Sequence, residues 1–127
     1  MATIELTAAN LEQTIQDSDT LFIDFWAAWC GPCRMFAPVF EAASQKYEGV
    51  TFAKLDTEAH GEIAAALEIQ AIPTLMAFRD GVLVYRNAGA LNASGLDELI
   101  GAVKAIDSDE LAKQVAEQQA QQSAPQN

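Results

Sequence analysis

The two cysteines of this chain, Cys30 and Cys33, are separated by two residues and stand at the junction of two different hydrophobic patterns. Residues 21–26, Leu-Phe-Ile-Asp-Phe-Trp, are apolar on both faces and predict a buried strand, and residues 32–47 predict a helix. Cysteines at this spacing can close and open a disulfide with almost no backbone movement. The pair is therefore predicted to be a reversible two-electron switch at the start of a helix.

Hydrophobic periodicity predicts strands that alternate with helices, followed by a late hairpin. The predicted strands are 4–6, 21–26, 51–56, 74–78 and 82–85, and the predicted helices are 9–17, 32–47, 62–67 and a last one that follows an Asn92 cap. The hairpin turn is predicted at Asp80-Gly81. This order indicates an α/β fold with parallel pairs in the middle of the sheet and an antiparallel edge.

The chain is short and acidic, and its negative charge excludes some classes of binding partner. A formal net charge of −11 over 127 residues argues against binding to nucleic acid or to an anionic membrane. No segment approaches the roughly 18 apolar residues that span a bilayer, and residues 1–5 have no basic, signal-like character. We expect one domain with no export signal, and two cysteines at redox spacing then favour the reducing cytosol.

The segment Trp29-Cys30-Gly31-Pro32-Cys33 resembles the active site of thioredoxins, and the resemblance runs from about Ile4 to Ile106 with the same order of elements. It implies a three-layer α/β/α thioredoxin fold with a mixed sheet of about five strands and four helices. It also implies a cytoplasmic general protein-disulfide reductase that acts by thiol–disulfide exchange, maintains redox homeostasis and binds no cofactor. Its expected partners are disulfide-containing proteins and a thioredoxin reductase that uses flavin and NADPH, and we expect a monomer.

The two cysteines are predicted to have different roles. Cys30 would lie at a helix N-terminus, where free backbone amides and the positive end of the helix dipole favour a thiolate. Cys33, one turn further in, should be shielded from solvent and poorly ionised. Cys30 would therefore attack the substrate disulfide, and Cys33 would resolve the mixed disulfide.

Asp24 is the only charged residue in the apolar strand 21–26, so burial should raise the pKa of its carboxyl group. In thioredoxins the matching buried aspartate accepts or donates the proton of the resolving cysteine, with a lysine nearby. The resemblance implies that Asp24 activates Cys33 and that Lys54 modulates Asp24.

Thioredoxins also carry a cis proline in the Ile-Pro-Thr sequence that Ile72-Pro73-Thr74 resembles, packed against the cysteine pair. Such a bond would expose the backbone of Ile72 for strand-like pairing with an extended substrate. The implied substrate-binding surface consists of Trp29, Gly31, Pro32, Ile72, Pro73, Ala88, Gly89 and Ala90. Trp26 is expected to support the motif from beneath, although core packing explains this residue equally well.

Four other interpretations of the cysteine pair compete with a reductase site. A zinc site needs about four ligands, and the pair with the lone His60 supplies three. A structural disulfide in so small a loop would constrain little of the unfolded chain. Disulfide oxidants and isomerases tend to have histidine in place of Pro32 and live in oxidising compartments. A binding module with incidental cysteines would keep its function when both cysteines are replaced by serine.

Residues 107–127 differ in composition from the predicted domain, 1–106. They hold four acidic residues, one lysine and six glutamines, with Leu111 and Val115 as the only sizeable apolar side chains. A helix over 109–122 is allowed by propensity, yet two apolar residues offer little to pin it to a core. We predict a flexible or loosely helical polar tail, with a partner-binding helix as the alternative.

Overall fold

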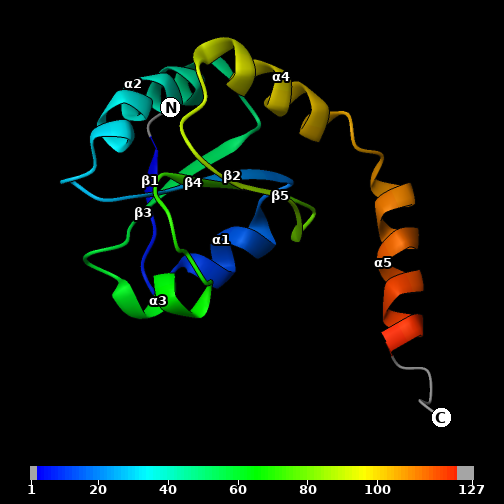
Figure 1. Cartoon of the computed structure of the whole chain (residues 1–127). Coiled ribbons are helices and arrows are strands. Elements are labelled where there is room, and N and C mark those ends of the chain that lie inside the picture. The colour runs from blue at the N-terminus through cyan, green and yellow to red at the C-terminus, as the bar shows by residue number, and fades with distance from the viewer. Residues whose placement is uncertain (1–2, 123–127) are drawn as a thin grey trace.

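A computed structural model describes residues 3–122 as a five-stranded mixed sheet with helices on both faces (Figure 1). The strands are β1 (Ile4–Glu5), β2 (Thr20–Trp26), β3 (Thr51–Asp56), β4 (Thr74–Arg79) and β5 (Val82–Ala88). The helices are α1 (Leu11–Asp17), α2 (Gly31–Lys46), α3 (Gly61–Ala66), α4 (Ala93–Lys104) and α5 (Ser108–Gln122). The predicted α/β architecture is confirmed, and the helix beyond the expected four lies in the C-terminal tail.

The strand order in the sheet is β1-β3-β2-β4-β5. β3 pairs in parallel with β1 and β2, whereas β4 pairs antiparallel with β2 and β5. The β4–β5 connection is the predicted hairpin, in which Asp80 and Gly81 both have positive φ, 52° and 79°. β2 lies at the centre of the sheet, which explains why its sequence is apolar on both faces.

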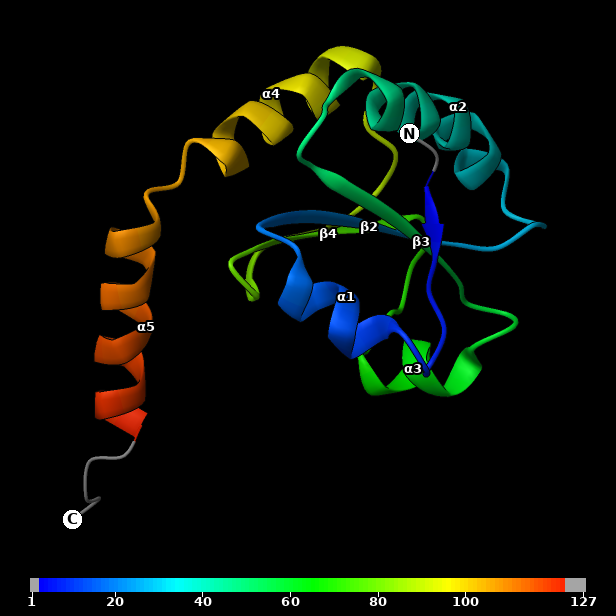
Figure 2. The same ribbon diagram turned by 180° about the vertical axis from the view of Figure 1, so that it is seen from behind.

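α2 and α4 cover one face of the sheet, and α1 and α3 cover the other (Figures 1 and 2). The alternation of side chains along β2 divides the core between these two faces. Phe22 belongs to the cluster packed under α2 and α4, and Leu21, Ile23 and Phe25 belong to the cluster on the α1 and α3 side. Asp24 follows Phe22 by two residues and therefore lies on the α2 face. This periodicity puts a carboxyl group beneath the helix that carries Cys33.

α2 begins directly after Cys30, whose sulfur caps it by accepting a hydrogen bond from the backbone amide of Cys33. Pro32 stands in the first turn, where the missing amide proton costs nothing and the fixed φ suits a helix. The helix buries Phe36 and Phe40 against the sheet. The sequence that starts the helix is thus the redox motif itself.

α5 leaves the domain after Ile106 and runs alongside the β5 edge of the sheet, with its C-terminal end directed away (Figures 1 and 2). Its first turn is capped by Asp107, whose carboxylate accepts a hydrogen bond from the Glu110 amide at 2.9 Å. Leu111 is its one buried residue within the described part. The helix that propensity allowed over 109–122 is present over 108–122.

Candidate redox site

Cys30 and Cys33 are joined as a disulfide at the β2–α2 junction, with their Cα atoms 5.2 Å apart. The Cys30 sulfur lies 3.2 Å from the Cys33 backbone nitrogen and 3.6 Å from the carbonyl oxygen of Ile72. Both cysteines are shielded, with 4% and 2% of their surfaces exposed. The predicted shielding of Cys33 is confirmed, and in the disulfide form Cys30 is almost as deeply covered.

The Cys30 sulfur lies at the start of α2, where one backbone amide faces it. The Cys33 amide already points at it, and the Arg34 amide bonds the Cys30 carbonyl at 3.2 Å to begin the helical hydrogen-bond ladder. A thiolate at Cys30 would receive the same amide donor together with the positive end of a 16-residue helix. This arrangement stabilises an anion at Cys30 after the disulfide is reduced.

The peptide bond between Ile72 and Pro73 is cis, as predicted from the resemblance. The Pro73 carbonyl accepts a hydrogen bond of 2.8 Å from the Gly89 amide, and Thr74 pairs with Ala88 across β4 and β5. Gly89 has φ +112°, a conformation that L side chains rarely adopt. The structure therefore brings the proline loop and the end of β5 together.

These contacts place the predicted substrate-binding residues at one end of the sheet, around Cys30. Trp29, Gly31, Pro32, Ala88, Gly89 and Ala90 are exposed, Ile72 is half-buried, and Pro73 is buried. Trp29 is 66% exposed, an unusual state for so large an apolar side chain. The result is a small apolar surface beside a disulfide.

Two contributors to this region were not predicted from the sequence. The indole nitrogen of Trp29 donates a 2.8 Å hydrogen bond to the carboxylate of Glu58, in the loop between β3 and α3. Met35, the fifth residue of α2, is 76% exposed. The sequence around Glu58 did not indicate a contact with Trp29, because acidic residues are common in exposed loops. The contact depends on a partner that lies 29 residues away in the chain.

Asp24 is fully buried, and neither of its carboxylate oxygens has a hydrogen-bond partner within residues 3–122. In the sheet it stands between Lys54 on β3 and Leu75 on β4. Burial raises the pKa of Asp24 from 3.8 to about 7, and the positive charge of Lys54 opposes this increase. The pKa of Asp24 thus changes in the predicted direction, and the modulation of Asp24 by Lys54 during the reaction stays a prediction.

Lys54 lies on the same face of the sheet as Asp24, with its amine 4.9 Å from the centre of the Trp26 ring. This cation–π contact positions the amine of the half-buried lysine over the indole ring. Trp26 in turn is fixed by its carbonyl oxygen, which accepts hydrogen bonds from the Thr57 amide at 2.9 Å and hydroxyl at 3.0 Å. Trp26 therefore supports the lysine that faces Asp24.

The part of the chain that the structure describes holds no cluster of three or more histidine, cysteine, aspartate or glutamate side chains able to bind a metal. Within residues 3–122 no helix has the length and apolar character needed to cross a bilayer.

Comparison with known proteins identifies one family. The sequence model of the family described as Thioredoxin matches residues 2–102. A relative from Streptomyces coelicolor, described as "Putative thioredoxin 2", is 48% identical over 120 residues, which cover 94% of this chain and 90% of the relative. A thioredoxin from Staphylococcus saprophyticus is 41% identical over 79% of this chain and 96% of its own length. The Streptomyces match thus extends past Ile106.

Solved structures show the same similarity. A mutant thioredoxin from Halobacterium salinarum superposes with a TM-score of 0.77 at 29% identity, covering 84% of this chain and 94% of that one. The oxidised mitochondrial thioredoxin 3 of Saccharomyces cerevisiae gives a TM-score of 0.72 at 36% identity over 79% of this chain and 94% of that one.

Proposed function

This chain belongs to the thioredoxin family of disulfide oxidoreductases, and we propose that it is a general protein-disulfide reductase of the cytosol. The observation that supports this most is the Cys30–Cys33 disulfide at the start of α2, beside an exposed apolar surface and above a buried carboxyl group. A nucleophile, a resolving thiol and a proton acceptor are the groups that thiol–disulfide exchange requires.

In the first step the Cys30 thiolate attacks one sulfur of a substrate disulfide. A bond forms between Cys30 and that sulfur, the substrate S–S bond breaks, and the other substrate sulfur leaves as a thiolate. The amides at the start of α2 stabilise the attacking anion. An extended substrate segment would pair with the backbone of Ile72, whose carbonyl oxygen lies 3.6 Å from the Cys30 sulfur.

In the second step Cys33 loses its proton and attacks the Cys30 sulfur. The Cys30–Cys33 bond forms, the second substrate sulfur leaves as a thiolate, and the substrate has gained two electrons. Asp24 is proposed to accept the Cys33 proton, since a carboxyl group with a pKa of about 7 takes up protons near neutral pH. Lys54, by lowering that pKa, keeps a larger share of Asp24 ionised and ready.

Turnover requires an external reductant for the disulfide. We assign this role to a thioredoxin reductase that carries flavin and uses NADPH, while this chain acts as a monomer with no bound cofactor. The tail, 107–127, is not assigned a part in the chemistry, because none of its side chains is redox-active.

The decisive experiment measures NADPH-dependent reduction of a protein disulfide such as insulin with a bacterial thioredoxin reductase. The protein should support turnover, Cys30→Ser should abolish it, and the reduction potential should lie near the −270 mV typical of thioredoxin. A potential near −120 to −180 mV would instead indicate an oxidant or isomerase. Full biological activity of a variant with both cysteines replaced by serine would indicate a binding module.

A further inference from the structure

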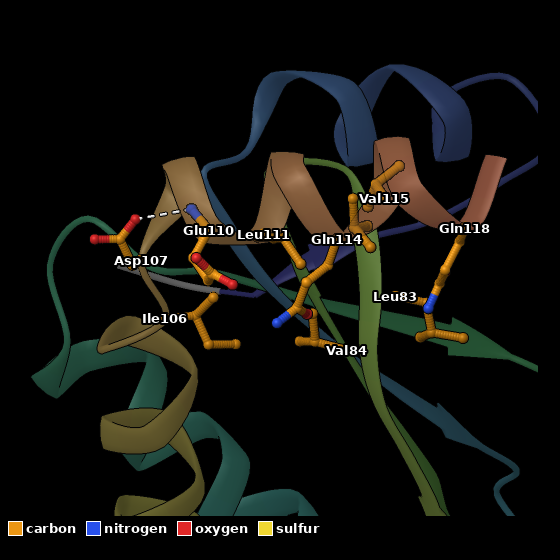
Figure 3. Close-up of a pocket in the computed structure, with 10 residues that line it drawn as sticks. Leu83, Val84, Ile106, Asp107, Glu110, Leu111, Gln114, Val115 and Gln118 are labelled. Carbon is orange, nitrogen blue, oxygen red and sulfur yellow. Dashed lines mark hydrogen bonds between the residues drawn. The ribbon is translucent and has the colours of Figure 1, made fainter. Parts of the chain in front are cut away.

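Beyond the redox site, a pair of grooves runs between α5 and the edge strand β5. A cavity of about 470 Å³ lies between the Leu83–Val84 region of β5 and the first turns of α5, and Figure 3 shows Gln114 and Gln118 directed towards these two β5 residues. A second cavity, of about 270 Å³, lies on the other side of the contact. Leu111, Val115 and Val82 border both cavities.

The grooves exist because α5 is attached at few points. Leu111 is its one buried side chain in the described structure, and the β5 residue Leu83 remains 45% exposed beside it. The helix is nevertheless fixed at its root, where the Arg79 guanidinium lies 3.4 Å from the carbonyl oxygen of Ile106. The attached helix α5 and the exposed edge of β5 together form the two grooves, and the floor of these grooves is apolar.

This surface is remote from the disulfide. In the pairing of β2 with β4, Phe25 faces Thr74 at the redox end, and Thr20 faces Arg79 at the opposite end. Val82 pairs with Arg79, so the grooves adjoin that opposite end. A molecule bound there would leave the surface around Cys30 free.

All ionisable side chains that line the two grooves are acidic, namely Asp80, Asp107 and Glu110. Arg79 lies 3.8 Å from Asp80, and Asp107 caps α5, whereas the Glu110 carboxylate forms no salt bridge within residues 3–122. The apolar floor therefore has an unneutralised negative rim. A second copy of this chain would bring the same carboxylates and a net charge of −11, which disfavours self-association.

We propose that the α5–β5 grooves form a second docking surface for a basic amphipathic segment of a partner protein, with apolar side chains on the floor and Lys or Arg at the rim. The apolar side chains would cover Leu83 and Val84, and the cations would face Glu110 and Asp107. The proposal concerns binding alone, so it stands or falls independently of the redox chemistry.

The test uses a synthetic amphipathic peptide with leucine on one face and lysine on the other. Its binding to the full-length protein is followed at 150 mM salt by amide chemical shifts and by fluorescence anisotropy. We expect saturable binding, with shifts confined to β5 and α5 and no change in the rate of reduction of a small disulfide. Peptides with glutamate in place of lysine, or serine in place of leucine, should bind at least about tenfold more weakly.

Matched variants separate this surface from general attraction to an acidic protein. Glu110→Lys should weaken binding about fivefold or more, whereas Glu117→Lys makes the same charge change on the same helix outside the grooves and should weaken it less than about twofold. Leu83→Gln should weaken binding, whereas Ile4→Gln removes a similarly exposed apolar residue from the opposite edge strand and should not.

Equal weakening by the two charge variants, or shifts spread over the surface or centred on Trp29, would overturn the proposal. No saturable binding at millimolar peptide would also overturn it. Sedimentation of the protein alone as a dimer, with the grooves at its interface, would assign the surface to a second copy and contradict the basic partner.

Discussion

The indole nitrogen of Trp29 is tied to the carboxylate of Glu58 by a 2.8 Å hydrogen bond, although the two residues lie in different loops. Glu58 is itself placed by Asp56, whose carboxylate accepts hydrogen bonds from the backbone amides of Glu58 and Ala59. The exposed ring beside the disulfide is therefore held by a turn at the end of β3. This link connects the geometry of the sheet to the proposed substrate-binding surface.

Removal of this hydrogen bond should weaken substrate docking and spare the chemistry. Glu58→Ala should raise KM for a protein disulfide about two- to tenfold with little change in kcat, because this hydrogen bond is exposed to solvent and a typical hydrogen bond contributes about 0.5–1.5 kcal/mol net. Glu58→Gln keeps an acceptor oxygen, so its KM should lie between that of the unaltered protein and that of Glu58→Ala. A lower kcat at unchanged KM would show that Glu58 acts on the reaction itself.

Asp24 should make the protein less stable as pH rises. Between pH 3.8 and about 7 the folded state holds a proton on Asp24 that the unfolded chain has released, so raising the pH through this window favours unfolding. The free energy of unfolding falls by about 1.4 kcal/mol for each pH unit in this window, on the order of 4 kcal/mol in total above pH 7. Stability is fully retained below the unfolded pKa.

Asp24→Asn should therefore stabilise the protein at pH 8 by about 2 kcal/mol or more, after the cost of a buried amide, and have little effect at pH 4. Denaturant unfolding at several pH values measures this difference. Asp19→Asn, which removes an exposed carboxylate, is the matched control and should leave the pH dependence unchanged. If Asp24→Asn were less stable than the unaltered protein at pH 8, the conclusion that the buried, unpaired Asp24 carboxylate destabilises the fold would be wrong.

Lys54 should set the pH at which the mixed disulfide is resolved. Its positive charge lowers the pKa of Asp24, so Lys54→Met should raise that pKa above about 7. The pH midpoint for resolution by Cys33 should then move upward, and Lys54→Arg should restore it. Stopped-flow kinetics across pH 5–9 would reveal the change, and an unchanged midpoint in the methionine variant would remove Lys54 from the mechanism.

The two cysteines should be distinguished by trapping. Cys33→Ser cannot resolve the mixed disulfide, so a substrate protein should accumulate as a covalent adduct through Cys30. Mass spectrometry of the adduct after proteolysis identifies the linked residue. An adduct through Cys33 in a Cys30→Ser protein, formed at a comparable rate, would reverse the assigned roles.

The tail should be dispensable for reduction of general substrates. A chain that ends at Ile106 retains both core clusters, and Leu111 is the one buried residue lost among the described residues 107–122, so it should fold and keep kcat/KM within about twofold. Activity with insulin and a thermal melt test this directly. A large loss of activity with insulin would show that α5 takes part in catalysis or in holding the domain.

Much of the fold was readable from local sequence. The apolar run at β2, the Asn92 cap of α4 and the Asp80-Gly81 turn each predicted an element that the structure contains. These signals are local because a strand, a helix cap and a tight turn depend on neighbouring residues. Among the site residues, the cysteine spacing predicted the disulfide, and the charge within an apolar strand predicted the raised pKa of Asp24.

Contacts between residues far apart in the chain could not be predicted in this way. The Trp29–Glu58 hydrogen bond, the Lys54–Trp26 contact and the docking of α5 on β5 depend on where strands and loops meet in space. Propensity allowed a helix in the tail, but its two apolar residues gave no indication of the strand edge they would reach.

Local sequence is thus sufficient to predict a redox-active cysteine pair that starts a helix after a buried strand with one carboxyl group. The surroundings of this pair come from the packing of the whole chain, since the Ile72 carbonyl, the Gly89 loop and Lys54 arrive from three other segments. The difference arises because chemical reactivity resides in individual side chains and their immediate neighbours. Desolvation, charge pairing and an apolar docking surface arise only when distant segments pack together.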